Sequence, residues 1–114
     1  MSDCVFCGIV AGGIPATVVH RDELAVAFHD ISPSTPVHVL VVPVRHIGGI
    51  AEVVEGDAPV VGHLLAVAAS VARGLGLEDN GYRVVVNQGR DGGQSEGHLH
   101  LHVLGGRKMR WPPG

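Results

Sequence analysis

The segment 98–102 reads His-Leu-His-Leu-His, and this strict alternation constrains the fold more than any other feature of the chain. Residues two apart on a β-strand point to the same face of the sheet. The alternation therefore predicts a strand over 98–104 in which neighbouring imidazoles lie about 6.8 Å apart on one face. The leucines and Val103 should then face the core. Threonine, lysine or serine would serve equally well on a solvated face, so three histidines in register indicate a site that carries chemistry.

The remaining β-branched runs predict four further strands, because each run is bounded by turn residues or by proline. These strands cover 17–20, 24–29, 37–42 and 82–87. The polar residues 21–23 should join the first two as a hairpin.

Helix signals are strongest in the middle of the chain. Asp57 is the expected N-cap of the main helix, Pro59 lies in its first turn, and Gly74 or Gly76 ends it. A short helix is expected over 47–55 and a helical turn followed by a loop over 1–16. Strands and helices in this order favour an α+β fold, in which an antiparallel sheet has helices on one side.

Charge and hydropathy exclude several classes of partner. The formal net charge is −3 and no basic tract is present, which argues against binding to a nucleic acid backbone. The longest apolar runs are far shorter than a membrane span. No basic segment followed by an apolar one opens the chain, so we expect no signal peptide, no membrane partner and a cytoplasmic protein.

A glycine-rich loop, 88–97, precedes the histidine strand. Within it, residues 91–95 read Asp-Gly-Gly-Gln-Ser and bring backbone N–H groups to the end of that strand. Such a loop can cradle an anion. The histidines alone allow either a zinc site or nucleophilic and acid–base chemistry. The loop favours phosphate chemistry.

Cys4 and Cys7 form a C-x-x-C motif. Taken alone, the motif allows a redox pair, two buried thiols or half of a zinc site. No βαβ pattern surrounds it, which disfavours a thioredoxin-like role. A zinc site would need two more ligands.

The segment 98–104 is similar to the His-φ-His-φ-His-φ-φ signature of the histidine triad (HIT) superfamily, where φ is apolar. Six other segments resemble its nucleotide-binding protein branch: 28–33, 62–64, 81–83, 85–87, 91–95 and 109–114. The resemblance covers essentially the whole chain. It implies a single HIT domain, 1–114, with residues 107–114 as a C-terminal tail. The implied fold is an antiparallel sheet of about five strands with one main helix and a short helix, paired as a homodimer.

The resemblance also implies catalytic roles. His100 would attack the α-phosphorus of a nucleotide ester or amide, and the nucleotidyl-histidine would then be hydrolysed. His102 would bind the phosphate, Ser95 would protonate the leaving group, and His38 would orient the nucleophile through hydrogen bonding. No cofactor is implied for catalysis.

A purine nucleotide is the implied ligand. Asp30 would bind the ribose hydroxyls, since a carboxylate accepts two hydrogen bonds. The other implied binding residues are Phe6, Phe28, Ile31, Asn87, Gln94, Ser95 and His102. Ile14 and Leu40 are equally well explained as core residues.

Cysteine-bearing relatives place two histidines beside their C-x-x-C pair. At those positions this chain has His46 and His98, which implies a structural zinc bound by Cys4, Cys7, His46 and His98. His20, His29 and His63 are expected to be structural.

The activity implied first is that of a purine nucleoside phosphoramidase. A dinucleoside polyphosphate hydrolase or nucleotidyltransferase is the enzymatic alternative, and a nucleotide-binding regulatory protein is the non-enzymatic one. The main helix is apolar on more than one side, which agrees with a homodimer.

Overall fold

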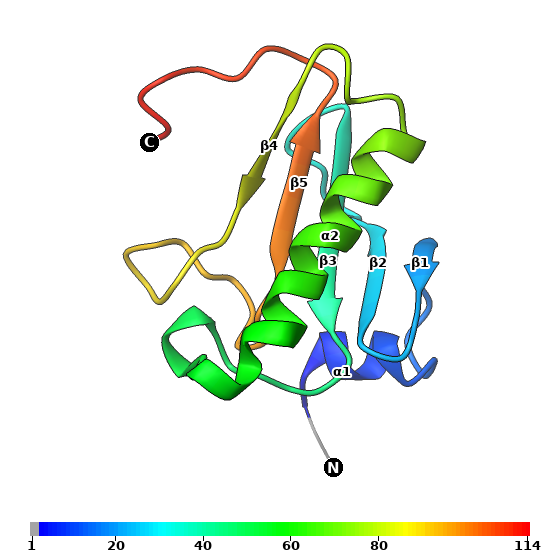
Figure 1. Cartoon of the computed structure of the whole chain (residues 1–114), viewed down its shortest axis with the longest axis vertical. Coiled ribbons are helices and arrows are strands. Elements are labelled where there is room, and N and C mark those ends of the chain that lie inside the picture. The colour runs from blue at the N-terminus through cyan, green and yellow to red at the C-terminus, as the bar shows by residue number, and fades with distance from the viewer. Residues whose placement is uncertain (1–2) are drawn as a thin grey trace.

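The computed structural model describes residues 3–114, so residues 1–2 of the expected domain lie outside the described part. Figure 1 shows one sheet crossed by a long helix. The strands are β1 (Val18–Arg21), β2 (Ala25–His29), β3 (Val37–Pro43), β4 (Tyr82–Val85) and β5 (Leu101–Gly105). The helices are α1 (Val5–Val10) and α2 (Ala58–Gly74), with two short 3-10 turns at Ile50–Glu52 and Glu55–Asp57.

All neighbouring strands are antiparallel, in the order β1-β2-β3-β5-β4. The expected α+β fold with a five-stranded antiparallel sheet and one main helix is therefore confirmed. The hairpin of β1 and β2 is also present, and β5 lies between β3 and β4. This central position of β5 brings the histidine segment next to β3, where Leu40 is the register partner of His102.

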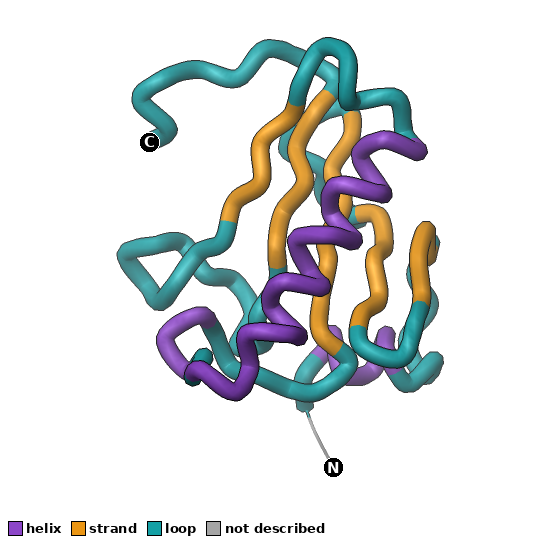
Figure 2. Tube along the Cα trace, viewed as in Figure 1, coloured by secondary structure: helices purple, strands orange, loops and turns teal. Residues whose placement is uncertain are grey.

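Helix α2 covers one face of the sheet and runs diagonally across it (Figure 2). Alternate residues of β2, β3 and β5 pack against it, among them Ala27, Val41 and Leu101. The other residues of β2 and β3 point to the opposite face, where Phe6 and Ile9 of α1 join them. The expectation that all helices lie on one side is thus wrong for α1, because this short helix carries its own apolar pair and covers the second face.

Three other details differ from expectation. The segment 47–55 forms 3-10 turns rather than one helix, and β5 begins only at Leu101, so the first two triad histidines precede the strand. Asp57 is the N-cap residue of α2 but makes no capping bond. Its carboxylate instead accepts the N–H of Val54 and pairs with Arg45.

Leu64 anchors α2 on the sheet, since its side chain is completely buried in the larger core. We expect Leu64→Ala to lower the free energy of unfolding by about 2–5 kcal/mol, because the substitution removes buried methyl groups and leaves a cavity. Urea unfolding followed by circular dichroism measures this change. Leu24→Ala is the matched control, because Leu24 is also a leucine but is 43% exposed and lies in the turn between β1 and β2. Equal losses in the two variants would contradict the assignment of Leu64 to the core.

Candidate active site and metal centre

A pocket lies on the α1 face of the sheet, with a volume of about 230 Å³. Its apolar wall comes from Phe6, Ile9, Ile14, Phe28 and Leu40. His100, His102, Asp30 and Ser95 line its polar side. A pocket with an apolar wall and a few convergent polar groups is the usual form of a small-ligand site.

His100 has a defined orientation. Its Nδ1 lies 2.7 Å from the carbonyl oxygen of His98, and the imidazole is 3% exposed. A carbonyl only accepts, so Nδ1 carries the proton and Nε2 of the neutral ring has a lone pair. Phe6 packs edge-on against this ring at a centroid distance of 5.1 Å. The surroundings therefore fix His100 as a nucleophile or base at Nε2.

The hydrogen bonds of His38 and His102 define which nitrogen of each ring carries the proton. The N–H of Ser34 donates to Nδ1 of His38 at 3.0 Å, so the proton of neutral His38 lies on Nε2. That N–H faces Nδ1 of His102 at 2.9 Å, which leaves the proton of His102 on its own Nε2. This atom is buried and has no hydrogen-bond partner among residues 3–114. An unsatisfied buried donor in a pocket wall is suited to an anionic oxygen.

Burial keeps this pair neutral. It lowers the pKa of His38, and Asp30, whose Oδ2 lies 3.5 Å from His38 Nε2, only partly opposes that effect. Burial, together with the charges of His100 and His38, lowers the pKa of His102 to about 4. Both rings are therefore neutral near pH 7, as the proton positions assigned from their hydrogen bonds require.

The lowered pKa of His102 predicts a pH dependence of stability. Between its ordinary pKa of 6.5 and about 4, the unfolded chain binds a proton that the folded chain does not. Stability therefore falls on acidification through this window, by up to about 1.4 kcal/mol per pH unit. With zinc kept saturating, we expect the loss of unfolding free energy between pH 7 and pH 5 to be about 1–2 kcal/mol smaller in His102→Gln. Equal losses in the two proteins would contradict the assigned shift.

A second cluster lies at the beginning of α1. Cys4 is the N-cap of this helix, and its Sγ accepts the N–H of Cys7 at 3.3 Å. His98 Nδ1 lies 3.3 Å from Cys4 Sγ, and His46 Nδ1 lies 3.2 Å from Cys7 Sγ. The two Nδ1 atoms are 3.1 Å apart. The sequence-predicted set of four ligands is therefore brought together, with all four ligand atoms within 4.8 Å of one another.

Whether these four residues suit a metal depends on which ring nitrogen of His98 carries the proton. Nε2 of His98 lies 3.0 Å from the carbonyl oxygen of Pro43, so Nε2 carries the proton and the Nδ1 lone pair faces the sulfurs. Zn–S bonds of about 2.3 Å and Zn–N bonds of about 2.0–2.1 Å place tetrahedral ligands roughly 3.3–3.8 Å apart. The observed separations are close to these values. The four residues fit a structural zinc ion, and the carbonyl of Pro43 supplies the outer partner that fixes a ligating histidine.

His98 also joins the two centres. Its side chain belongs to the cysteine cluster, while its backbone carbonyl holds the proton of His100. A metal bound by Cys4, Cys7, His46 and His98 would therefore fix the backbone that orients His100.

The other predicted residues are placed unevenly. Ser95 is exposed at the pocket edge, and Ile31 lines the pocket although it is 94% exposed. Gln94 lies outside the pocket lining, and its amide is bound to Gly89 N, Gly48 O and Glu96 O. Asn87 is also outside that lining. In this structure Gln94 organises the loop, and the loop carries Ser95 to the pocket.

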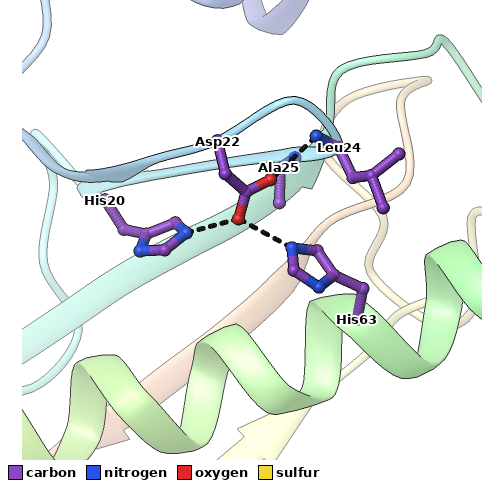
Figure 3. A network of polar contacts seen from close by, with 5 residues as sticks. All are labelled: His20, Asp22, Leu24, Ala25 and His63. Carbon is purple, nitrogen blue, oxygen red and sulfur yellow. Dashed lines mark hydrogen bonds and ion pairs between the residues drawn. The ribbon is translucent and has the colours of Figure 1, made fainter.

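Sequence reasoning missed two features. Ile9 completes the apolar wall, and its spacing of three from Phe6 on a helix is the signal that indicates it. His20 and His63, expected to be structural, converge on Asp22 (Figure 3). The His-x-Asp spacing of 20 and 22 was visible, but its partner on α2 is 41 residues from Asp22.

Buried imidazoles lie beside an apolar pocket on a five-stranded antiparallel sheet. This arrangement defines a class of small α+β proteins that use histidine side chains in their chemistry. The HIT domain family model matches residues 11–109. The chain belongs to the histidine triad family, a superfamily of nucleotide-binding proteins and hydrolases.

Several proteins are similar to this chain in sequence or in structure. A 14 kDa zinc-binding protein from Zea mays is 49% identical over 115 residues, covering 99% of this chain and 89% of the relative. The crystal structure of a HIT family hydrolase from Legionella pneumophila has a TM-score of 0.96 and 46% identity, covering 98% of this chain and all of that one. A zinc-bound histidine triad family protein from Mycobacterium smegmatis has a TM-score of 0.81 and 34% identity, covering 92% and 76%.

Proposed function

We propose that this protein is a purine nucleoside phosphoramidase, which cleaves a P–N bond and releases a nucleoside 5′-monophosphate. The observation that carries the proposal is the orientation of His100, whose Nδ1 proton is held by the His98 carbonyl so that Nε2 is available beside the pocket. Neutral imidazole is a competent nucleophile near pH 7.

In the first step, the Nε2 lone pair of His100 attacks the α-phosphorus and the bond from phosphorus to the leaving nitrogen breaks. The leaving amine takes a proton from solvent through the hydroxyl of Ser95, which is exposed at the pocket edge and accepts a solvent proton as it gives its own. The unpaired N–H of His102 donates to a phosphoryl oxygen, where negative charge builds up. In the second step, water attacks the nucleotidyl-histidine, the bond to His100 breaks, and the proton lost by water passes to solvent.

The pocket supports a nucleotide as the ligand. The apolar wall formed by Phe6, Phe28 and Leu40 suits the faces of a purine base. Asp30 lies on the polar side of the same pocket and would accept hydrogen bonds from ribose hydroxyls. Its Oδ1 already accepts the N–H of Ser32, which fixes the carboxylate.

The test is product release from defined substrates. Zinc-loaded protein is incubated with adenosine and guanosine phosphoramidates and, separately, with diadenosine polyphosphates, and monophosphate is measured by chromatography. The proposal expects the phosphoramidates to be the better substrates by kcat/KM. Preference for the polyphosphates would favour a polyphosphate hydrolase, and nucleotide binding without turnover of either class would favour a regulatory protein.

We also propose that the cysteine cluster binds one structural zinc ion and that catalysis needs no cofactor. The convergence of two sulfurs and two Nδ1 atoms supports the zinc, as does the name of the maize relative. A reducing compartment such as the cytoplasm would keep both thiols available to the metal. In the described residues, no helix has the length and hydropathy to cross a membrane.

A homodimer is proposed on the exposed edge of the sheet. Strand β4 is an edge strand, with Tyr82 and Val86 at that edge each 37% exposed, and Leu65 of α2 is 52% exposed. Unpaired strand edges and exposed apolar helix faces are typical of partner surfaces. Sedimentation equilibrium should give twice the 11.8 kDa chain mass, and Leu65→Glu should shift the protein toward the monomer. A wild-type monomer at assay concentration would contradict this assembly.

A further inference from the structure

His20, Asp22 and His63 form a cluster on the α2 face of the sheet (Figure 3), and none of them lines the nucleotide pocket. His20 lies on β1, Asp22 in the turn between β1 and β2, and His63 on α2. The register partner of His20 is Ala27, which packs in the core beneath α2. The three side chains are each about one-third exposed, at 31%, 29% and 33%. The site is therefore open to solutes but built from three separate elements.

The carboxylate of Asp22 is held in one orientation. Its Oδ1 accepts the N–H groups of Leu24 at 2.8 Å and Ala25 at 2.9 Å. Its Oδ2 is left facing the two histidines, with His20 Nε2 at 2.6 Å and His63 Nε2 at 2.7 Å. These bonds hold the pKa of Asp22 well below its usual range. One charged oxygen thus meets two imidazole nitrogens.

Two imidazoles and one carboxylate oxygen are a donor set that divalent transition ions prefer. All three donor atoms lie within 4.8 Å of one another. Metal–ligand bonds of about 2.0–2.2 Å place tetrahedral ligands roughly 3.3–3.5 Å apart. Small rotations of the two partly exposed histidines would open the present separations to that value. Arg21, the nearest cation in sequence, donates to the carbonyl of Val10 instead of entering the cluster.

We propose that His20, Asp22 and His63 bind a divalent transition ion of the zinc class, with water completing its coordination. The ion takes the place of the two Nε2 protons, and both rings then carry their proton on Nδ1. It links the β1–β2 turn to α2 and has no thiolate ligand, which distinguishes it from the cysteine cluster.

The test uses Co²⁺ added to protein whose cysteine cluster is already loaded with zinc. We expect one further equivalent of Co²⁺ to bind by calorimetry, with a weak visible spectrum that lacks thiolate-to-cobalt charge transfer. We also expect the ion to raise the Tm. A thiolate-to-cobalt band would show cobalt in the cysteine cluster, and a band that accounts for the whole added equivalent would overturn the proposal.

Variants locate the ion. His20→Gln and His63→Gln should each weaken binding of the added equivalent more than tenfold, and the double variant should lose both the binding and the Tm increase. His29→Gln is the matched control, because it removes a histidine outside both clusters. Circular dichroism and zinc content check that each variant is folded. No further equivalent in the wild type, or an equivalent that survives in the double variant but is lost in His38→Gln, would overturn the proposal.

Discussion

Replacing His100 by alanine should lower the rate of phosphoramidate hydrolysis by about 10³-fold or more. The substitution removes Nε2 of His100, whose lone pair is free because the His98 carbonyl holds the ring proton on Nδ1. Without this atom, no covalent intermediate can form. Rates are measured under single-turnover conditions, where chemistry is separated from product release. Acid-quenched wild-type reactions with labelled substrate should contain nucleotide attached to protein, whereas reactions of the variant should contain none.

The control for this prediction is ligand binding. His100→Ala keeps Asp30, His102 and most of the apolar wall, so its affinity for the monophosphate product should stay within a few fold of wild type. A variant that binds product normally but still turns over substrate at a comparable rate would show that His100 is not the nucleophile. Loss of binding together with altered circular dichroism would indicate a folding defect, and His100→Gln then repeats the test with a bulkier side chain.

Loss of the proposed zinc ion should have the second large effect. We expect Cys4→Ser combined with Cys7→Ser to lower the free energy of unfolding by about 3 kcal/mol or more, which corresponds to a Tm decrease of about 10 °C or more. Without the ion, α1 loses its tie to His46 and His98, which are 39 and 91 residues away from Cys7. Differential scanning calorimetry and metal analysis of protein purified without chelator provide the measurements.

The same variant should also lose activity through kcat more than through KM. The pocket wall remains, but the backbone carbonyl that orients His100 is no longer held by a fixed His98 side chain. Chelator treatment should reproduce the effect in the wild type and add nothing to the double variant. Unchanged Tm and sub-stoichiometric zinc in the wild type would rule out the structural ion.

Local patterns in the sequence were sufficient for much of this fold. Period-two alternation placed Leu101 and Val103 in the core, and it grouped His100 and His102 on the opposite face, where both line the pocket. Alternation does not encode where strand pairing begins, so the start of β5 at Leu101 could not be predicted from it. The position of α1 was equally inaccessible, because it depends on a contact between Phe6 and β2 residues more than 20 positions away.

The candidate site, like the fold, was predictable from the sequence only in part. Resemblance indicated the four residues around the metal centre, and the structure brings them together. The resemblance also suggested that Asn87 and Gln94 bind the ligand. Side-chain hydrogen bonds within a loop depend on tertiary geometry, however, and the Gln94 side chain is hydrogen-bonded to its own loop. The tautomers of His38 and His102 follow from the N–H of Ser34, which no motif would indicate.

His98 uses three different atoms for three purposes: Nδ1 faces the cysteine cluster, Nε2 binds Pro43, and the carbonyl oxygen holds His100. For protein engineering, this means that the proposed zinc site and the segment that carries His100 cannot be exchanged independently. A metal-free redesign has to leave His98 in place and replace Cys4, Cys7 and His46 with apolar residues that pack around its ring. Grafting the triad onto another scaffold likewise requires a rigid residue two positions before the histidine that corresponds to His100.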